Sequence, residues 1–239
     1  MKISLYSIIV AFISLSMFQC ENPTEKQEER YTYKTHSPDG IGKFYMGREI
    51  SRVMGYQGIQ WLERPEREKE ENTSQLIKNM KISPEDTIAD IGAGSGYHVF
   101  KTAPLASKGL VYAVDIQDEM LNVIEQQKEK TGINNIEIVK GSEKEVNLPE
   151  KSVDKILMVD VYHEFSYPVE MLQSMRKALR EDGKIYLVEY RGEDESIPIK
   201  KLHKMTEEQA VKEFNANGFK LKENFLILPW QHCMVFQKK

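Results

Sequence analysis

Cysteine is scarce in this sequence, and neither sign of charge dominates it. The 239 residues contain two cysteines, Cys20 and Cys233. Two cysteines are too few for a disulfide framework or a cysteine-based metal cage, so we expect no metal site. The formal net charge of −4 offers little attraction for a phosphate backbone, and nucleic acid is therefore not expected as a partner.

Long apolar runs are also missing, with one exception at the start of the chain. Lys2 precedes an apolar stretch over residues 3–18, Cys20 follows it, and residues 21–35 are rich in charge. This order is typical of an export signal, and a cysteine at its end resembles the lipid-attachment site of bacterial lipoproteins. We expect residues 1–20 to attach the protein to a membrane of a bacterial cell envelope and residues 21–35 to form a charged linker. The alternatives are an uncleaved membrane anchor, or a misassigned start and a cytoplasmic protein.

Two folded regions are predicted after the linker. With 40% hydrophobic and 29% charged residues, the chain suffices for one core and a small accessory layer. Residues 36–80 are predicted to form a helical cap, because Tyr45, Ile50 and Val53 share one helical stripe. Residues 81–239 alternate apolar β-branched runs with helical stretches, which predicts a doubly wound, mostly parallel α/β sheet. Seven strands are expected, at 87–91, 111–116, 136–139, 153–159, 184–189, 221–228 and 233–237, the last two as an antiparallel hairpin.

The most informative segment joins the first of these strands to the helix after it. It reads Asp-Ile-Gly-Ala-Gly-Ser-Gly, with Gly92, Gly94 and Gly96 at alternate positions. Glycine permits a tight turn and lets the backbone approach a ligand closely, and ligands of open parallel sheets bind where strands end. A dinucleotide-binding loop would require a glycine at Tyr97, and a phosphate-binding P-loop would require a Gly-Lys-Ser/Thr sequence. The spacing disfavours both.

The loop resembles the nucleotide loop of class I S-adenosylmethionine-dependent methyltransferases, and the resemblance extends from about residue 82 to the C-terminus. It implies a Rossmann-like methyltransferase fold with S-adenosylmethionine as the cofactor. It assigns Asp115, at the end of the second strand, to the two ribose hydroxyls and Ile116 to the adenine face. The full set of cofactor-binding residues that it implies is Asp90, Gly92, Gly94, Gly96, Asp115, Ile116, Ser142, Glu143 and Asp160.

The residues after the fourth strand are the candidates for the acceptor side. The sequence there is Tyr162-His163-Glu164, and the resemblance places it beside the transferable methyl group. Histidine titrates near neutral pH and suits a general base. We therefore expect His163 with Glu164 to remove a proton from the acceptor and Tyr162 to face it. His203 and His232 are weaker candidates.

The predicted cap supplies candidate lid residues. Tyr45-Met46-Gly47-Arg48 and Trp61 are expected to close over the cofactor and the acceptor. Arg48 is expected to meet a carboxylate of one of these two ligands. A simple packed cap is the alternative for the whole region.

The expected function is methyl transfer from S-adenosylmethionine to a small-molecule acceptor, at oxygen or carbon, by in-line displacement. The chain loosely resembles ubiquinone/menaquinone-type methyltransferases through Val114-Asp115-Ile116 and residues 202–206. One alternative is a protein methyltransferase, which would need an open cleft. Another is a non-catalytic S-adenosylmethionine-binding protein of the cell envelope, and a dinucleotide-dependent oxidoreductase is the third.

Overall fold

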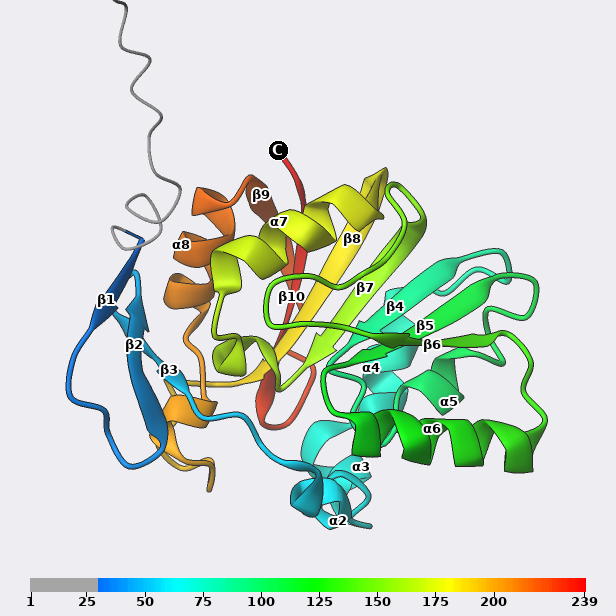
Figure 1. Ribbon diagram of the computed structural model, residues 1–239, viewed down its shortest axis with the longest axis horizontal. Helices are drawn as coiled ribbons and strands as arrows, with labels where there is room; N and C mark the ends of the chain where they lie inside the picture. Colours follow the sequence, from blue (N-terminus) through cyan, green and yellow to red (C-terminus); the bar gives the residue numbers. More distant parts are fainter. Residues whose placement is uncertain (1–29) are drawn as a thin grey trace, which may run out of the picture.

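A seven-stranded sheet forms the centre of the protein in a computed structural model that describes residues 30–239 (Figure 1). The strand order is β6-β5-β4-β7-β8-β10-β9. Only β10 runs antiparallel to its neighbours, so the predicted mostly parallel sheet with a C-terminal antiparallel hairpin is confirmed. The strands are β4 (Thr87–Ile91), β5 (Leu110–Asp115), β6 (Ile136–Lys140), β7 (Val153–Val159), β8 (Leu179–Tyr190), β9 (Phe219–Asn224) and β10 (Gln231–Lys238).

Helices cover both faces of this sheet. Successive side chains of a strand point to opposite faces; Ala89 and Ile91 of β4 therefore belong to one hydrophobic cluster and Ile88 to the other. Because both faces are buried, the central strands β4 and β5 are apolar nearly throughout, whereas the edge strand β9 alternates apolar and polar residues. The covering helices are α7 (Pro168–Ala178) and α8 (Glu207–Ala216) on the first face, and α4 (Thr73–Met80), α5 (Val99–Thr102) and α6 (Asp118–Thr131) on the second.

The N-terminal region departs from the predicted helical cap and linker. A three-stranded antiparallel sheet forms there from β1 (Tyr31–Tyr33), β2 (Gly40–Tyr45) and β3 (Arg48–Ser51). Met46 and Gly47 join β2 to β3 with φ of 48° and 98°, and such left-handed two-residue turns match the twist of a hairpin. The helical prediction was wrong here because methionine stands where asparagine or aspartate usually marks this turn.

Short helices begin only after this hairpin. They are η1 (Tyr56–Gly58), α2 (Ile59–Leu62) and α3 (Arg67–Glu71), and α4 follows them. The Nε2 atom of Gln117, directly after β5, donates a hydrogen bond of 3.0 Å to the carbonyl of Met54. Leu62 packs against Gly94. The segment from Met54 to Leu62 therefore lies over the ends of β4 and β5.

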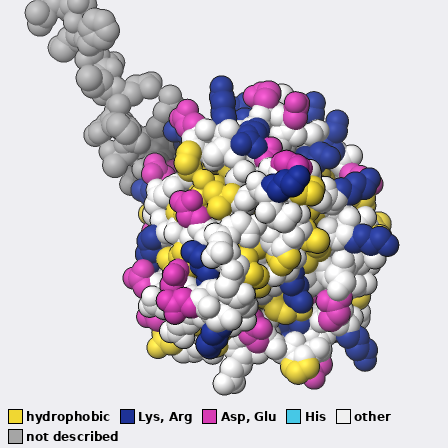
Figure 2. All heavy atoms as spheres, turned by 90° about the vertical axis from the view of Figure 1, so that its right-hand side faces the viewer, with side chains coloured by type: hydrophobic (Ala, Val, Ile, Leu, Met, Phe, Trp, Pro, Cys, Tyr) yellow, Lys and Arg dark blue, Asp and Glu magenta, His cyan; other side chains and the backbone are white. Residues whose placement is uncertain are grey.

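The expected membrane attachment concerns residues 1–20, which lie outside the described residues. Within residues 30–239, no helix has both the length and the apolar character needed to cross a membrane. On the face drawn in Figure 2, lysine and arginine side chains are interspersed with acidic ones, and hydrophobic side chains appear between them.

Candidate active site

The glycine loop after β4 has the backbone conformation that its sequence predicts. Gly92, Gly94 and Gly96 all have positive φ, of 74°, 54° and 83°, where residues with a Cβ atom are strained. A Cβ at Gly92 would lie 2.4 Å from Cγ2 of Val161, so the loop and the end of β7 touch directly. Gly92 and Gly94 line a cavity, whereas Gly96 packs against Ile124 of α6. The predicted role of Gly96 is therefore confined to shaping the loop.

Asp115, the last residue of β5, connects that strand to the glycine loop. Its Oδ2 accepts the N–H of Gly94 at 2.9 Å and its Oδ1 accepts the N–H of Gln117 at 2.9 Å. Burial raises the pKa of this carboxyl, although these hydrogen bonds oppose the shift. A carboxylate has about four lone-pair positions, so acceptor capacity is left for hydroxyl groups in the cavity that Asp115 lines.

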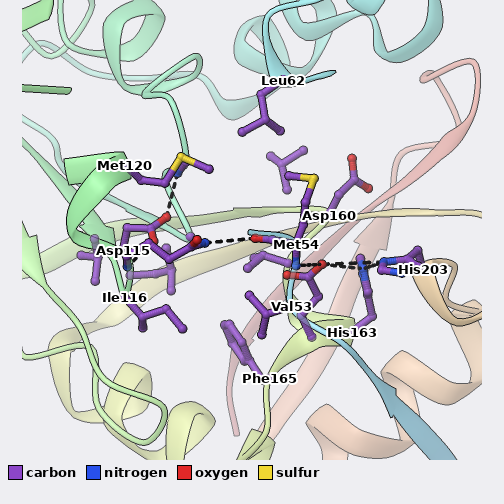
Figure 3. A pocket seen from close by; sticks show the side chains of 18 of the residues that line it. Val53, Met54, Leu62, Asp115, Ile116, Met120, Asp160, His163, Phe165 and His203 are labelled. Atoms are coloured by element: carbon purple, nitrogen blue, oxygen red, sulfur yellow. Dashed lines mark hydrogen bonds and ion pairs between the residues drawn. The ribbon is translucent and has the colours of Figure 1, made fainter. Parts of the chain in front are cut away.

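The wall beyond Asp115 has the residues expected around a flat base. Ile116 is 39% exposed and lines the cavity next to Met120 (Figure 3). Ser142 and Glu143 lie at the same end. The Ser142 hydroxyl accepts the N–H of Glu145 at 2.9 Å, which fixes the turn after β6.

Two buried carboxylates lie at the carboxyl ends of β4 and β7. Asp160 follows β7 with φ of 50°, and its Oδ2 accepts a hydrogen bond of 2.7 Å from Gln231. Oδ1 of Asp160 and Oδ2 of Asp90 are buried without a hydrogen-bond partner. Burial raises the pKa of Asp90 to about 7 and that of Asp160 well above its ordinary value. Asp160 lines the cavity, whereas Asp90 lies outside its lining.

His163 and Glu164 face the opposite end of the cavity, together with His203 (Figure 3). Nε2 of His163 lies 3.2 Å from Nδ1 of His203, and Oε1 of Glu164 lies 3.8 Å and 3.7 Å from these two nitrogens. Burial raises the pKa of Glu164 to about 7, whereas burial and the charge of His163 lower that of His203 to about 4.

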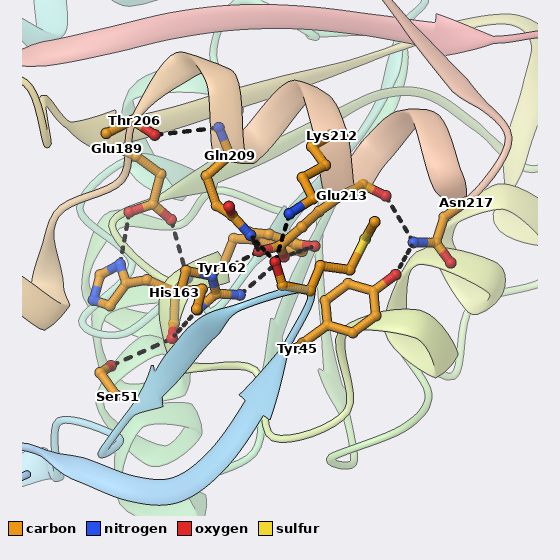
Figure 4. Close-up of polar contacts among 12 residues, drawn as sticks. Tyr45, Ser51, Tyr162, His163, Glu189, Thr206, Gln209, Lys212, Glu213 and Asn217 are labelled. Atoms are coloured by element: carbon orange, nitrogen blue, oxygen red, sulfur yellow. Dashed lines mark hydrogen bonds and ion pairs between the residues drawn. The ribbon is translucent and has the colours of Figure 1, made fainter. Parts of the chain in front are cut away.

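Glu189 of β8 anchors His163 from behind. Its fully buried carboxylate lies 2.6 Å from Nδ1 of His163 (Figure 4). Burial alone would lower the pKa of His163, but the negative charge and hydrogen bond of Glu189 raise it above its ordinary value. Glu189 was not predicted as a site residue, although the sequence contains a signal for it: a lone acid at the end of the apolar run Ile-Tyr-Leu-Val-Glu.

Tyr162 and Arg48 do not reach the cavity, which corrects both predictions. Residues 162–164 form the short helix η2 (Tyr162–Glu164), so their side chains diverge and the large ring of Tyr162 enters the core beside Phe214. Its hydroxyl donates to Glu213 at 2.8 Å. Arg48 forms an ion pair of 2.8 Å with the same Glu213. The carboxylate that Arg48 meets is thus one of the protein's own.

Of the predicted lid residues, Trp61 lines the cavity, and it does so beside residues that were not predicted as part of the lid. Met54, Trp61 and Leu62 line the cavity, whereas residues 45–48 do not. Met54 connects the two ends of the cavity, because its carbonyl accepts from Gln117 and its N–H donates to Glu164 at 3.1 Å. The lid therefore contacts both the Asp115 side and the Glu164 side.

One cavity of about 440 Å³ contains both groups of candidate residues. Asp115 and Ile116 lie at one end, and His163 and His203 lie at the other (Figure 3). The volume is that of a typical cofactor pocket. The glycine loop and Asp115 therefore share one cavity with the titratable side chains His163 and His203, at the carboxyl ends of β4, β5 and β7.

A cavity beside a glycine loop at the carboxyl ends of parallel strands is typical of α/β enzymes, which bind their ligands at this edge of the sheet. The family model described as "Methyltransferase domain" matches residues 82–234. The chain belongs to this methyltransferase family. The predicted enzyme class and the predicted cofactor, S-adenosylmethionine, agree with this finding.

Comparisons with individual proteins agree with the family. The chain is 25% identical over 127 residues to the uncharacterized methyltransferase YcgJ of Bacillus subtilis, covering 53% of this chain and 49% of that protein. It is 23% identical over 114 residues to the demethylmenaquinone methyltransferase of Oceanobacillus iheyensis, covering 47% and 48%. The chain thus spans about half the length of these two curated relatives.

Solved structures show the same fold. A methyltransferase from Aquifex aeolicus, described as dependent on S-adenosylmethionine, superposes with a TM-score of 0.73 and 22% identity, covering 77% of this chain and 98% of that one. The trans-methyltransferase CalH, solved with S-adenosylhomocysteine, gives a TM-score of 0.55 and 17% identity, covering 69% and 55%. These likenesses confirm the predicted Rossmann-like methyltransferase fold.

Proposed function

We propose that this protein transfers a methyl group from S-adenosylmethionine to a small-molecule acceptor, at oxygen or carbon. The observation that carries the proposal is the single cavity that joins Asp115 and the glycine loop to His163, Glu164 and His203. S-adenosylmethionine would supply a methyl group already activated as a sulfonium. The chain therefore has to align S-adenosylmethionine with the acceptor, exclude water and allow the acceptor to lose a proton.

Several observations support the assignment of the cofactor half. Asp115 has the free acceptor capacity that two ribose hydroxyls require, and the exposed Ile116 offers an apolar face for adenine. Ser142 and Glu143 line the same cavity and would contact the adenine edge. The unpartnered oxygen of Asp160 suits the ammonium group of the methionine moiety, because a buried carboxylate gains most from an opposite charge.

The lid segment, which contacts both ends of the cavity through Met54, favours a small acceptor over a protein. Met54 contacts both ends of the cavity through its backbone, and Leu62 packs on Gly94. A polypeptide acceptor would need a more open cleft. One relative is named for a small acceptor, demethylmenaquinone, which supports the same class.

The experiment is methyl transfer from radiolabelled S-adenosylmethionine into a cell extract that is then separated into small-molecule and protein fractions. We expect label in the small-molecule fraction with the wild-type chain and its loss with Asp115→Ala. Label in proteins would support the alternative of a protein methyltransferase. No transfer, despite tight binding of S-adenosylhomocysteine, would support a non-catalytic binding protein.

Attachment of the protein to a cell-envelope membrane through residues 1–20 is a separate part of the proposal. The charged and apolar pattern of these residues supports it. Fractionation of cells, combined with protease treatment of intact ones, tests attachment and shows on which side the methyltransferase domain lies. Recovery of the whole protein in the soluble fraction would contradict attachment.

A further inference from the structure

Three ligand-type side chains meet at the acceptor end of the cavity. His163, Glu164 and His203 each offer one atom, and these atoms lie within 4.8 Å of one another. Their separations are 3.2, 3.7 and 3.8 Å. The point equidistant from all three atoms lies about 2.1 Å from each, which is the length of a zinc–nitrogen or zinc–oxygen bond.

Neighbouring groups hold two of these three side chains in place. The carboxylate of Glu189 holds Nδ1 of His163, so an Nδ1–H tautomer leaves Nε2 as the atom with a free lone pair. A metal-binding histidine usually has such a carboxylate partner on its other nitrogen. The N–H of Met54 fixes the Glu164 oxygen in the same way. The cluster is therefore preorganised by groups that do not themselves reach its centre.

The cluster also has the open position that a catalytic metal requires. His163, Glu164 and His203 all line the cavity, and Figure 3 shows His163 and His203 close together at the end opposite Asp115. Three protein ligands and one position open to a pocket are typical of catalytic rather than structural zinc sites. Imidazole and carboxylate ligands together suit a borderline divalent ion such as Zn²⁺.

We propose that Nε2 of His163, Oε1 of Glu164 and Nδ1 of His203 bind one divalent metal ion of the zinc type, with the cavity side open to the acceptor. This differs from the expectation of no metal site, because the ligands are separated in the sequence by 38 residues between Glu164 and His203 and follow no known metal-binding spacing.

The chemical role of this ion rests on the proposed function. A hydroxyl of the acceptor at the open position would have a lowered pKa and release its proton to solvent. The oxygen lone pair would then form the bond to the methyl carbon while the carbon–sulfur bond breaks. The electron pair of that bond stays on sulfur, leaving a neutral thioether. The acceptor class is thus an alcohol or phenol, and oxygen is favoured over carbon.

Metal binding is tested directly on the purified, metal-free full chain by titration with Co²⁺ and Zn²⁺. We expect one Co²⁺ per chain with visible d–d absorption, displaced by Zn²⁺. Glu164→Gln and His203→Ala should weaken the affinity by about 100-fold or more, and Glu189→Gln by about 10-fold, since it only positions His163. Circular dichroism of each variant shows whether it folds.

The matched control is His36→Ala, which removes an exposed histidine outside the cavity and should leave the affinity unchanged. Absence of binding at micromolar metal, or equal affinity in the folded Glu164→Gln and His203→Ala variants, would overturn the metal site. Methyl transfer that persists after complete metal removal would overturn the proposed chemical role of the ion and favour direct proton removal by His163.

Failure of this inference can be told apart from failure of the proposed function. Binding of S-adenosylhomocysteine, measured on the metal-free chain, depends on the Asp115 half of the cavity. If it binds but Co²⁺ does not, the metal site alone is wrong. If Co²⁺ binds but S-adenosylhomocysteine does not, the methyltransferase proposal is wrong.

Discussion

Asp115 accepts the backbone N–H of Gly94 at 2.9 Å, so the acid at the end of β5 holds the glycine loop that follows β4. The two residues are 21 positions apart: Asp115 ends β5, and Gly94 lies in the loop that follows its parallel neighbour β4. The same carboxylate that holds the loop through this bond also lines the cavity. Its loss would therefore affect both the shape of the pocket and its contacts.

We predict that Asp115→Asn weakens binding of S-adenosylhomocysteine by about 10- to 100-fold, because hydrogen bonds to a charged group contribute about 1.5–3 kcal/mol. Calorimetric titration measures it. The control is Asp118→Asn, since Asp118 is exposed and pairs with the exposed Lys140. Equal affinity of Asp115→Asn and wild type would remove the assignment of Asp115.

The contact between Gly92 and Val161 gives a second prediction. Gly92→Ala introduces a Cβ 2.4 Å from Cγ2 of Val161, in addition to the cost of a positive φ. Gly132→Ala has a similar φ of 67° but no atom within 4 Å of the new Cβ, so it isolates the backbone cost of about 1–2 kcal/mol. We expect Gly92→Ala to lower the free energy of unfolding clearly more than Gly132→Ala. Equal losses in denaturant titrations would show that the loop relaxes away from β7.

The buried ion pair between Arg48 and Glu213 gives a third prediction. Glu213→Gln leaves the Arg48 charge buried without its partner. This should lower the free energy of unfolding by about 3–5 kcal/mol. The control, Glu85→Gln, breaks a pair whose side chains are more than half exposed and should cost less than about 1 kcal/mol. Urea unfolding of both variants measures the difference. A small loss in Glu213→Gln would mean that Arg48 finds another partner or water.

Asp90 makes the stability of the ligand-free protein depend on pH. Burial first, and the charge of Asp115 after it, raise its pKa from 3.8 to about 7, against an opposing effect of Arg67. The folded state thus holds the proton more tightly than the unfolded state, and this stabilisation is present below pH 4 and lost as pH rises through 7.

Asp90→Asn removes this dependence. Relative to that of wild type, the free energy of unfolding of the variant should rise by on the order of 3–4 kcal/mol between pH 4 and pH 7, at 1.36 kcal/mol per pKa unit. Urea titrations of both proteins across this range measure the gain. Asp118→Asn should follow the wild-type curve, and parallel curves for Asp90→Asn and wild type would contradict the raised pKa.

The main sheet and the cofactor half were predictable because their signals are local. The alternation of apolar runs and helices indicates a parallel sheet, and the spacing of Gly92, Gly94 and Gly96 indicates a ligand loop directly. Asp115 ends a strand next to that loop in any such sheet. Each of these predictions needs only a few consecutive residues and the topology of the fold.

The acceptor half was less predictable because it depends on contacts between distant segments. The approach of His203 to His163 spans 40 positions, and nothing near either residue in the sequence signals it. The inward turn of Tyr162 follows from Glu213, which is 51 positions away. The N-terminal hairpin was missed because Met46 occupies a turn position that usually has asparagine or aspartate.

The most direct test of the account is calorimetric titration of the full chain with S-adenosylhomocysteine, with NADH as a parallel ligand. We predict one site per chain with micromolar affinity for S-adenosylhomocysteine and none for NADH, because Tyr97 stands where a dinucleotide loop needs glycine. No binding of S-adenosylhomocysteine, or tighter binding of NADH, would contradict the proposal that the cavity between Asp115 and His163 holds a methyl donor.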